Sequence, residues 1–231
     1  MFRFKQFTVH QENSAMKVCT DSCLLGALAA ADQPANALDI GTGTGLLSLM
    51  LAQRYPALYV DAVEIDPGAA TDARHNFAHS PFADRLELYE CAIQDFETPE
   101  TYDLIISNPP FYENRLKSPD AHKNIAHHAT GLSFKELAAL SARLLSPSGI
   151  LWILLPPFEM TRFIQEAGIN ALGVKDRYIL RHNAGKPAFR EVVSFSRRPA
   201  EISSPHEIII YENDKYSRIF AELLRDYYLI F

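Results

Sequence analysis

The sequence has no apolar run of about eighteen residues, the length that a membrane-spanning helix requires. We therefore expect no membrane-spanning helix. The first stretch, MFRFKQFTVHQ, alternates apolar and polar residues and lacks the apolar centre of a secretory signal peptide. It is more typical of a strand that belongs to the fold. No repeat, low-complexity segment or linker interrupts the sequence, and 231 residues fit one large α/β domain.

Cysteine is also scarce. Cys19, Cys23 and Cys91 make an odd number, with no C-x-x-C pair and no histidine at the spacing of a zinc site. Cys19 and Cys23 lie four residues apart near a predicted helix start, so packing is the favoured role. We expect no metal site, and free thiols fit a reducing cytoplasm.

The sequence has fewer basic than acidic residues, and the basic residues are unevenly distributed. The net charge of −6 argues mildly against a nucleic-acid partner. Residues 84–103 carry seven acids and one base, whereas residues 174–198 carry seven bases and only Asp176 and Glu191 as acids. One face of the molecule can therefore be basic while the sum is acidic. A solvated, charged hairpin is the other interpretation of the same cluster.

Apolar segments of strand character alternate with segments of helical spacing through the first two thirds of the chain. The first predicted strand lies in residues 37–45, a short apolar segment followed by glycines. The other predicted strands cover residues 59–66, 86–91, 102–107 and 149–156. The predicted helices cover residues 46–55, 67–80, 133–145 and 158–168. This alternation indicates an α/β fold with a Rossmann-like, doubly wound, mostly parallel sheet, which we expect to have seven strands.

The pattern changes after residue 168. Residues 174–182 and 189–197 look like two strands joined through NAGKP, with no helix-length segment between them. They predict an antiparallel hairpin added to the sheet edge. Residues 207–212 are a further candidate strand, and residues 215–231 a terminal helix.

The stretch DIGTGTG follows the first predicted parallel strand, where open α/β sheets bind ligands. Glycines at 41, 43 and 45 (Gly41, Gly43 and Gly45) let the backbone approach a ligand at a helix N-terminus. A dinucleotide site needs its third glycine at position 46, where Leu46 stands, and Asp39 would repel a pyrophosphate. A ligand with a sulfonium and an ammonium group prefers a carboxylate nearby. The loop therefore favours S-adenosylmethionine over NAD as the cofactor.

Two further acids complete the predicted cofactor site. Glu64 ends the second strand about twenty residues after the glycines, where an acid accepts both ribose hydroxyls. A solvated strand end is the alternative role for this residue. Beyond the third strand, Asp95 and Phe96 offer an acid and an aromatic ring for the edge and face of adenine.

The fourth strand ends in Asn108-Pro109-Pro110-Phe111. An amine attached to an aromatic ring is a poor nucleophile because its lone pair is delocalised. The Asn108 side-chain oxygen and the Pro109 carbonyl can each accept one N–H and stabilise the positive charge that develops on nitrogen. Prolines hold the carbonyl direction, and Phe111 can stack on a flat substrate. A turn with a packed phenylalanine is the structural alternative.

The D-x-G-x-G-x-G loop, the acid after the second strand and NPPF together resemble class I amino methyltransferases that act on adenine N6 or on a glutamine amide. Residues 2–30, the stretch GTGTGLLSLMLAQR and the ending LLRDYYLIF are similar to bacterial tRNA(Val) adenine N6-methyltransferases. These enzymes modify the adenine beside the anticodon, at tRNA position 37. The similarity runs from Phe2 to Phe231. Where those relatives usually have Met-Lys-Val-Gly-Thr-Asp, this chain has Cys19 in place of glycine, so glycine-specific geometry is not assumed there.

The resemblance implies one methyltransferase domain over residues 1–231. Residues 1–30 would form a strand and helix over the cofactor, 31–168 the cofactor-binding and catalytic core, and 169–231 the hairpin and terminal helix. Three residues would then lie over the methionine part of the cofactor, namely Lys17, Thr20 and Asp21. From the residues alone, Thr20-Asp21 is a helix N-cap with an acid in the first turn, and both roles are compatible.

The predicted partner is tRNA, bound by two basic segments. The polar connection at 112–130 is long for a compact domain, and such loops are usually functional or mobile. Its candidate phosphate contacts are Arg115, Lys117, Lys123, His127 and His128. A metal-binding or catalytic role for the two histidines is the less favoured interpretation. The hairpin adds Arg177, Arg181, Lys186 and Arg190. An RNA-modifying enzyme takes its target base out of the stack, and we expect salt-sensitive tRNA binding.

Other classes remain open on the sequence. A protein glutamine N5-methyltransferase also acts on a weakly nucleophilic NH2 group, so the NPPF motif does not distinguish it from an enzyme that acts on adenine. The basic hairpin and the lack of a separate N-terminal helical domain favour RNA. A non-catalytic nucleotide-binding module would show a damaged NPPF or glycine loop, and both are intact. An NAD oxidoreductase is disfavoured because Leu46 stands where the third glycine is needed and Asp39 would repel the pyrophosphate. The oligomeric state is not predicted.

Overall fold

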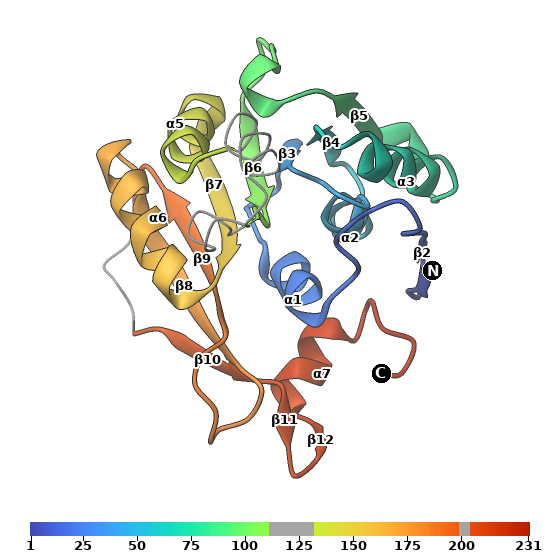
Figure 1. Ribbon diagram of the computed structural model, residues 1–231, viewed down its shortest axis with the longest axis vertical. Coiled ribbons are helices and arrows are strands. Elements are labelled where there is room, and N and C mark those ends of the chain that lie inside the picture. The colour runs from blue at the N-terminus through green and yellow to red at the C-terminus, as the bar shows by residue number, and fades with distance from the viewer. Residues whose placement is uncertain (111–131, 199–203) are drawn as a thin grey trace, which may run out of the picture.

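The computed structural model describes residues 1–110, 132–198 and 204–231. A central eight-stranded sheet has the order β10-β8-β9-β7-β6-β3-β4-β5 (Figure 1). The strands of its parallel part are β3 (Asn36–Ile40), β4 (Tyr59–Glu64), β5 (Leu86–Glu90), β6 (Tyr102–Ser107) and β7 (Leu145–Leu155). The others are β8 (Gly173–Arg181), β9 (Arg190–Ser196) and β10 (His206–Ile209). This confirms the predicted α/β fold with a mostly parallel sheet.

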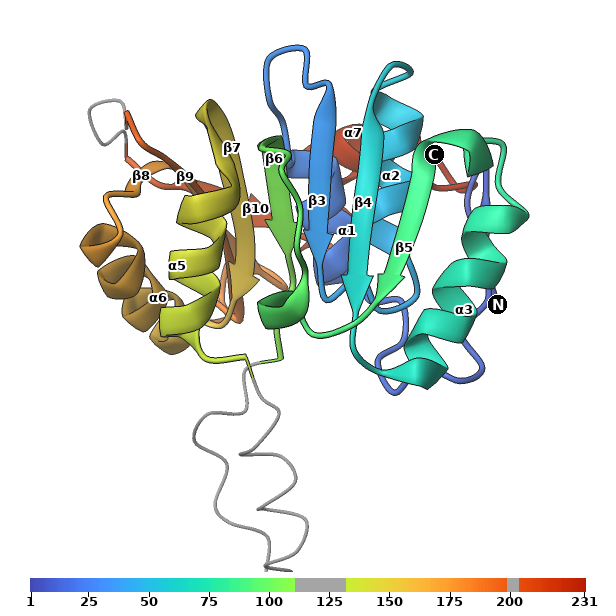
Figure 2. The ribbon, with the colours of Figure 1, turned by 90° about the horizontal axis from the view of Figure 1, so that it is seen from above.

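Helices cover both faces of this sheet (Figure 2). The first face carries α1 (Thr20–Leu28), α2 (Leu46–Arg54) and α7 (Arg218–Leu224), and the other carries α5 (Phe134–Leu144) and α6 (Pro157–Ile169). The helix α3 (Pro67–Ala78) packs beside β4 and β5. Among the described residues, no helix has the length and apolar character needed to cross a membrane.

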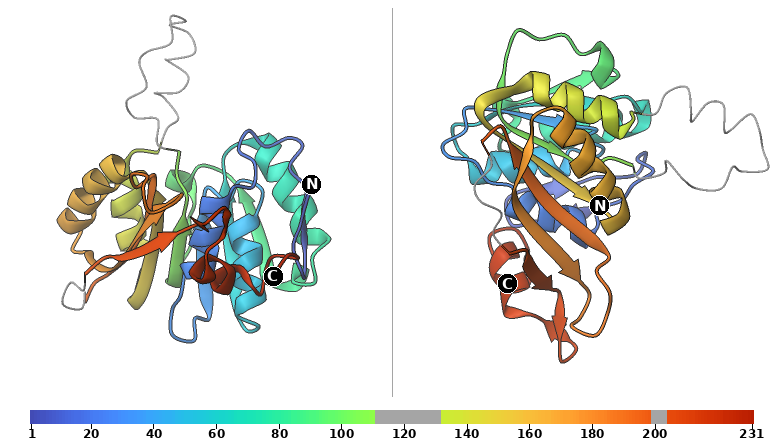
Figure 3. Two further views of the ribbon diagram at one scale, coloured as in Figure 1. Left: turned by 90° about the horizontal axis from the view of Figure 1, so that it is seen from below. Right: turned by 90° about the vertical axis from the view of Figure 1, so that its left-hand side faces the viewer.

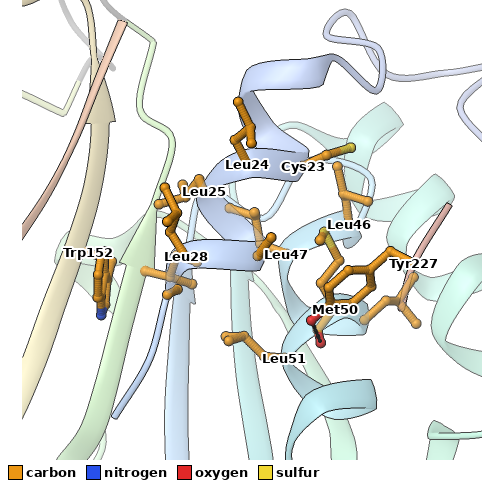
Figure 4. Close-up of a cluster of buried hydrophobic side chains, with 14 of the residues drawn as sticks. Cys23, Leu24, Leu25, Leu28, Leu46, Leu47, Met50, Leu51, Trp152 and Tyr227 are labelled. Carbon is orange, nitrogen blue, oxygen red and sulfur yellow. Dashed lines mark hydrogen bonds between the residues drawn. The ribbon is translucent and has the colours of Figure 1, made fainter. Parts of the chain in front are cut away.

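The alternation of side chains along the strands creates two buried clusters, one on each face. In β7, Trp152 and Leu154 enter the cluster under α1 and α2, whereas Ile153 and Leu155 enter the cluster under α5 and α6. Both faces of β7 are apolar, which explains its continuous hydrophobic sequence. Figure 4 shows how leucines of α1 and α2 interlock in the first cluster, with Trp152 at one side and Tyr227 at the other.

Local signals set several helix starts as predicted. Ser133 and Glu136 form a complete capping box at α5. Pro67 is the first residue of α3, and Asp66 accepts a hydrogen bond from the Ala69 N–H at 2.7 Å. These caps supply acceptors to backbone donors that a helix leaves unpaired at its start.

The hairpin is also confirmed: β9 pairs antiparallel with both β7 and β8, and β10 then pairs parallel with β8 (Figure 3, right). The sheet therefore has one strand more than predicted. The predicted terminal helix is shorter, because only Arg218–Leu224 is helical after the small hairpin of β11 (Tyr211–Glu212) and β12 (Lys215–Tyr216).

The N-terminal stretch does not join the main sheet. It forms a separate two-stranded hairpin of β1 (Phe2–Arg3) and β2 (Thr8–Val9), whose Phe4, Phe7 and Val9 are buried against the first cluster. The Lys5 N–H donates to the Tyr227 carbonyl at 2.8 Å, so the beginning and the end of the chain lie together.

Candidate cofactor and methyl-transfer site

The site lies at the carboxyl edge of the parallel strands. Figure 2 shows the arrowheads of β3, β4 and β6 ending together. The register aligns Asp39 of β3 with Ile106 of β6 and with Ala62 of β4. The glycine loop after β3, Glu64 at the end of β4 and Asn108 after β6 therefore meet at one edge, as the sequence predicted.

The three glycines of the loop all have a left-handed backbone, with φ of +71° at Gly41, +60° at Gly43 and +82° at Gly45. An added Cβ at Gly41 or Gly43 would meet no described atom within 4 Å, whereas at Gly45 it would lie 2.4 Å from Phe77 Cε1. Gly41 and Gly43 thus leave open space for a ligand. Gly45 instead allows the start of α2 to pack closely on α3.

Asp39 is fully buried behind this loop. Its Oδ2 accepts hydrogen bonds from Thr42 Oγ1 at 2.6 Å and from Ser48 Oγ at 2.7 Å, which ties the loop to α2. Its Oδ1 is buried without a hydrogen-bond partner in the described part of the chain. Burial raises the pKa of Asp39 to about 6, against the opposing effect of these hydrogen bonds. A cationic ligand group beside Oδ1 would satisfy both the orphaned acceptor and the buried charge.

Glu64 is buried and already oriented. Its Oε2 accepts the Gly43 N–H at 2.8 Å, and its Oε1 accepts the Asp66 N–H at 2.8 Å. Each carboxylate oxygen keeps a second lone pair for a ribose hydroxyl. These residues therefore fit the adenosine and amino-acid groups of S-adenosylmethionine.

The predicted adenine contacts are less closely grouped. Asp95 ends a short 3-10 helix, η2 (Ile93–Asp95), and its side chain is exposed. Phe96 is buried and packs edge-on against Tyr89, with ring centroids 4.9 Å apart. Less of the Phe96 ring is free for a base than the sequence suggests, because the ring belongs to the core under α5.

The N-terminal segment is fastened to α3 by two polar residues that the sequence analysis missed. Asp72 accepts hydrogen bonds from Asn13 and from the N–H and hydroxyl of Ser14, the latter two at 2.7 and 2.8 Å. Asn76 bonds to the backbone of His10 and to the Thr44 carbonyl. Asp72 and Asn76 lie four residues apart on a helix face that is otherwise apolar. Two polar residues on such a face indicate buried hydrogen bonds to another segment, and the sequence contains this pattern.

Burial alone would raise the pKa of Asp72, but the hydrogen bonds from Ser14 and Asn13 outweigh it and the pKa lies below the ordinary value. Lys17, an expected cofactor contact, donates from Nζ to the Ser14 carbonyl at 2.8 Å and to the Gln11 carbonyl. In the structure its ammonium thus stabilises the turn of this segment.

The first turn of α1 differs from the predicted N-cap. The N-cap is Cys19, which makes no side-chain capping bond, and Thr20 is the first helical residue. Asp21 accepts the Ser22 N–H at Oδ1 and the Arg190 Nε–H at Oδ2, at 3.1 and 3.0 Å. Because glycine is absent at position 19, this turn starts the helix without a left-handed residue.

The Asn108-Pro109-Pro110 corner after β6 is held from two sides. Ser107 Oγ donates to the Ile40 carbonyl at 2.7 Å, which fixes the end of β6 to β3. Asn108 donates from Nδ2 to Ser22 Oγ at 2.9 Å, while its Oδ1 is buried and has no partner among the described residues. Pro109 is buried and Pro110 is exposed. Phe111, the predicted stacking ring, lies outside the described residues.

The predicted substrate residues of the hairpin are in ion pairs. Arg177 makes a two-pronged contact with the buried Glu191, and the other two pairs are Arg181–Glu207 at 3.2 Å and Arg190–Asp21 at 3.0 Å. Their positive charge is therefore largely compensated, which the sequence pattern did not indicate. Five further candidates lie outside the described residues, namely Arg115, Lys117, Lys123, His127 and His128. Within the described ranges, no group of three or more His, Cys, Asp or Glu side chains is placed to hold a metal ion.

A glycine loop, an acid at the end of the neighbouring strand and an NPP corner at one edge of a doubly wound sheet define a class I methyltransferase with S-adenosylmethionine as its cofactor. The family model described as "Methyltransferase small domain" matches residues 14–167. The chain belongs to this family.

Relatives with full-length similarity carry a more specific name. A protein of Dyadobacter fermentans is 47% identical over 100% of this chain and 98% of its own length, and one of Pedobacter heparinus is 40% identical with the same coverage. Both are named tRNA1(Val) (adenine(37)-N6)-methyltransferase. The predicted resemblance is thereby confirmed.

Solved structures support the fold. A predicted O-methyltransferase from Agrobacterium tumefaciens superimposes with a TM-score of 0.67, at 18% identity, over 89% of this chain and 96% of its own. A putative RNA methyltransferase from Pyrococcus horikoshii gives 0.56 at 19% identity, over 84% and 91%. At this identity the likeness concerns the Rossmann-like fold alone.

Proposed function

We propose that this protein transfers the methyl group of S-adenosylmethionine to the exocyclic N6 amine of adenine 37 in a valine tRNA. Relatives of that name match this chain from end to end. The reaction belongs in the cytoplasm, which the free cysteines also suit.

The observation that carries this proposal is the buried, unpartnered Oδ1 of Asn108. It lies at the end of β6, the direct neighbour of β3, whose glycine loop faces the cofactor space. A hydrogen-bond acceptor that is buried and unused is costly in the free protein, so a substrate donor is expected to satisfy it.

The chemistry follows from this acceptor. Asn108 Oδ1 and the Pro109 carbonyl each take one N–H of the target amine, which draws the nitrogen towards a tetrahedral geometry and stabilises its developing positive charge. The rigid prolines limit the reorganisation needed. No strong general base is required, because the proton can leave after methyl transfer. The bound cofactor supplies the electrophilic methyl group, and positioning provides much of the remaining rate.

The hairpin offers an RNA-contacting surface at the same edge of the sheet. His182 stacks on Phe189 with centroids 4.1 Å apart and an interplanar angle of 12°, and the Arg190 guanidinium lies 5.9 Å from the Phe189 ring. His182 is exposed and Phe189 is partly buried, and an exposed ring held in this way can stack on an unpaired base. Lys186, in the turn beside them, is exposed and suits a phosphate.

A methylation assay with a labelled methyl donor tests the proposal. We expect N6-methyladenosine in the nucleoside digest of a valine tRNA transcript, and none when guanine replaces adenine 37. Asn108→Ala should bind S-adenosylhomocysteine as wild type does but lose about 10²- to 10³-fold in the single-turnover rate.

A matched control is Asn170→Ala, which removes an amide at the far end of α6, on the opposite edge of the sheet. Label in glutamine of a protein extract, with none in RNA, would show that the acceptor is a protein amide instead. Full turnover of Asn108→Ala would contradict the role assigned to this residue.

A further inference from the structure

The catalytic amide of Asn108 is held by a residue of another element. Its Nδ2 donates to Ser22 Oγ at 2.9 Å, across 86 positions of the sequence. Ser22 is the third residue of α1 and only 7% exposed. The helix that covers the cofactor edge, and not the catalytic strand, therefore fixes one end of the amide.

The orientation of this amide decides whether it can assist the reaction. An asparagine side chain has nearly the same shape when turned by 180°, but its oxygen accepts hydrogen bonds while its NH2 group donates them. With Oδ1 towards the substrate, Asn108 accepts a proton of the target amine. In the reverse orientation two NH2 groups would face each other, and the developing positive charge would be opposed.

A directed chain of contacts selects the productive orientation. A hydroxyl both donates and accepts, so Ser22 alone does not choose. Its Oγ also lies 3.0 Å from Cys19 Sγ. Burial first, and then the charge of Asp21 and a hydrogen bond to it, raise the pKa of the Cys19 thiol to about 11.

The thiol therefore keeps its proton at neutral pH, and the Asp21 carboxylate, which pairs with Arg190, offers only hydrogen-bond acceptors. A protonated thiol beside this carboxylate donates towards it, which leaves the sulfur to accept the Ser22 hydroxyl proton. The lone pairs of Ser22 Oγ then accept from Asn108. Arg190 anchors the far end of this chain through its 3.0 Å contact with Asp21.

We propose that Ser22 is a positioning residue that holds the Asn108 amide with Oδ1 towards the methyl acceptor. Asp21, through Cys19, sets the direction of the contact. The proposal deepens the proposed function, on which it rests for the identity of the acceptor. Any methyl acceptor with an NH2 group requires Asn108 Oδ1, and not Nδ2, to face it. The orientation of the amide is a property of the free protein and can therefore be tested without a substrate.

The first experiment measures the orientation directly. In protein labelled with ¹⁵N-asparagine, the two Nδ2 protons of Asn108 are assigned by their loss in Asn108→Ala. In wild type we expect one of them to exchange with solvent about tenfold more slowly than in Ser22→Ala, because a hydrogen bond protects it. Ser22→Thr keeps the hydroxyl and should restore the slow exchange.

The matched control is Ser141→Ala in α5, which also removes a fully buried hydroxyl, but one without a hydrogen-bond partner in the described chain. It should leave the Asn108 protons unchanged. Identical exchange of these protons in wild type and Ser22→Ala would overturn the proposal.

The second experiment measures the consequence for the reaction. Ser22→Ala should lower the single-turnover rate about tenfold while the affinity for S-adenosylhomocysteine stays within about twofold. A tRNA with inosine at position 37 presents a carbonyl oxygen in place of the amine. Wild type should bind it about tenfold more weakly than the adenine tRNA, and Ser22→Ala, whose amide is free to turn, should lose most of this discrimination.

The outcomes separate the two proposals. If wild type shows the slow exchange but methylates no tRNA, the proposed function fails and the positioning role stands. If tRNA is methylated but Ser22→Ala matches wild type in exchange, rate and discrimination, the positioning role alone fails.

Discussion

At the scale of single residues, two buried oxygens at the sheet edge have no partner among the described residues, Asp39 Oδ1 and Asn108 Oδ1. The other polar atom of each of these side chains is held by a hydrogen bond. Ser48 donates to Asp39 Oδ2, and Ser22 accepts from Asn108 Nδ2. Such half-satisfied groups are expensive to keep. Their fixed orientation means that little reorganisation is needed when a ligand provides the missing donor.

Asp39 gives a prediction about protons. Its pKa of about 6 in the free protein means that close to half of the molecules are protonated at that pH. A cationic ligand favours the ionised form, so binding of S-adenosylmethionine, which carries a sulfonium charge, should release about half a proton at pH 6, falling to almost none at pH 8. The affinity should weaken as the pH falls below 6, because protonated Asp39 has lost its charge.

Calorimetry in two buffers with different ionisation enthalpies measures this release. Asp39→Asn, which carries no titrating proton, should abolish it. Release of the same size in Asp39→Asn would assign the proton to another group.

At the scale of elements, the N-terminal segment is held in place by side-chain contacts. Asp72 collects four hydrogen bonds from Asn13 and Ser14, and Asn76 adds the contacts to His10. Asp72→Ala should lower the free energy of unfolding by about 2 to 3 kcal/mol, because it leaves buried donors unpaired. The affinity for S-adenosylhomocysteine should fall about tenfold, since the segment borders the glycine loop through Asn76 and Thr44.

Urea unfolding and ligand titration measure the two effects. Asp84→Ala, an exposed acid on η1 (Ala83–Arg85), is the control and should change neither. If Asp72→Ala lost stability but kept its affinity for S-adenosylhomocysteine, Asp72 would stabilise the fold without contributing to ligand binding.

The elements that the sequence predicted well are those governed by local signals. The capping box at Ser133, the proline start of α3 and the apolar strand β7 all depend on residues close in sequence. The N-terminal hairpin and the end of α7 were less well predicted, because their boundaries depend on the packing of one chain end against the other. Lys5, for example, bonds through its side chain to the Arg225 and Phe231 carbonyls.

The same distinction holds for the site. The shared location of Asp39, Glu64 and Asn108 was predictable because parallel strands bring their ends to one edge, a rule that needs only the alternation of elements. The pair of Ser22 with Asn108 and the pair of Asp21 with Arg190 join positions 86 and 169 residues apart. No local pattern encodes such pairs.

At the scale of the whole molecule, a net charge of −6 is combined with a hairpin whose arginines are paired. Arg177 and Lys186 should therefore behave differently on substitution. Arg177→Gln leaves the 3% exposed Glu191 without its partner and should cost about 2 to 3 kcal/mol of unfolding free energy. Lys186→Gln should change that free energy by less than about 0.5 kcal/mol.

Binding of tRNA should show the opposite order. The affinity should fall as salt rises, and Lys186→Gln should reduce the slope of log K against log salt by about one, as for one lost phosphate contact. Filter binding across a range of salt concentrations measures this. An affinity for tRNA that does not vary with salt would contradict a basic contact surface.

The direction of β8 has a consequence for how such an enzyme can diversify. Because β9 runs antiparallel between β7 and β8, the connection of residues 182–189 returns to the edge that holds the glycine loop. Extra residues inserted there would extend the rim of that edge while every strand pairing of the sheet stays intact. The architecture thus separates the strands that carry the glycine loop, Glu64 and Asn108 from a connection whose length can change without altering the pairing of the strands.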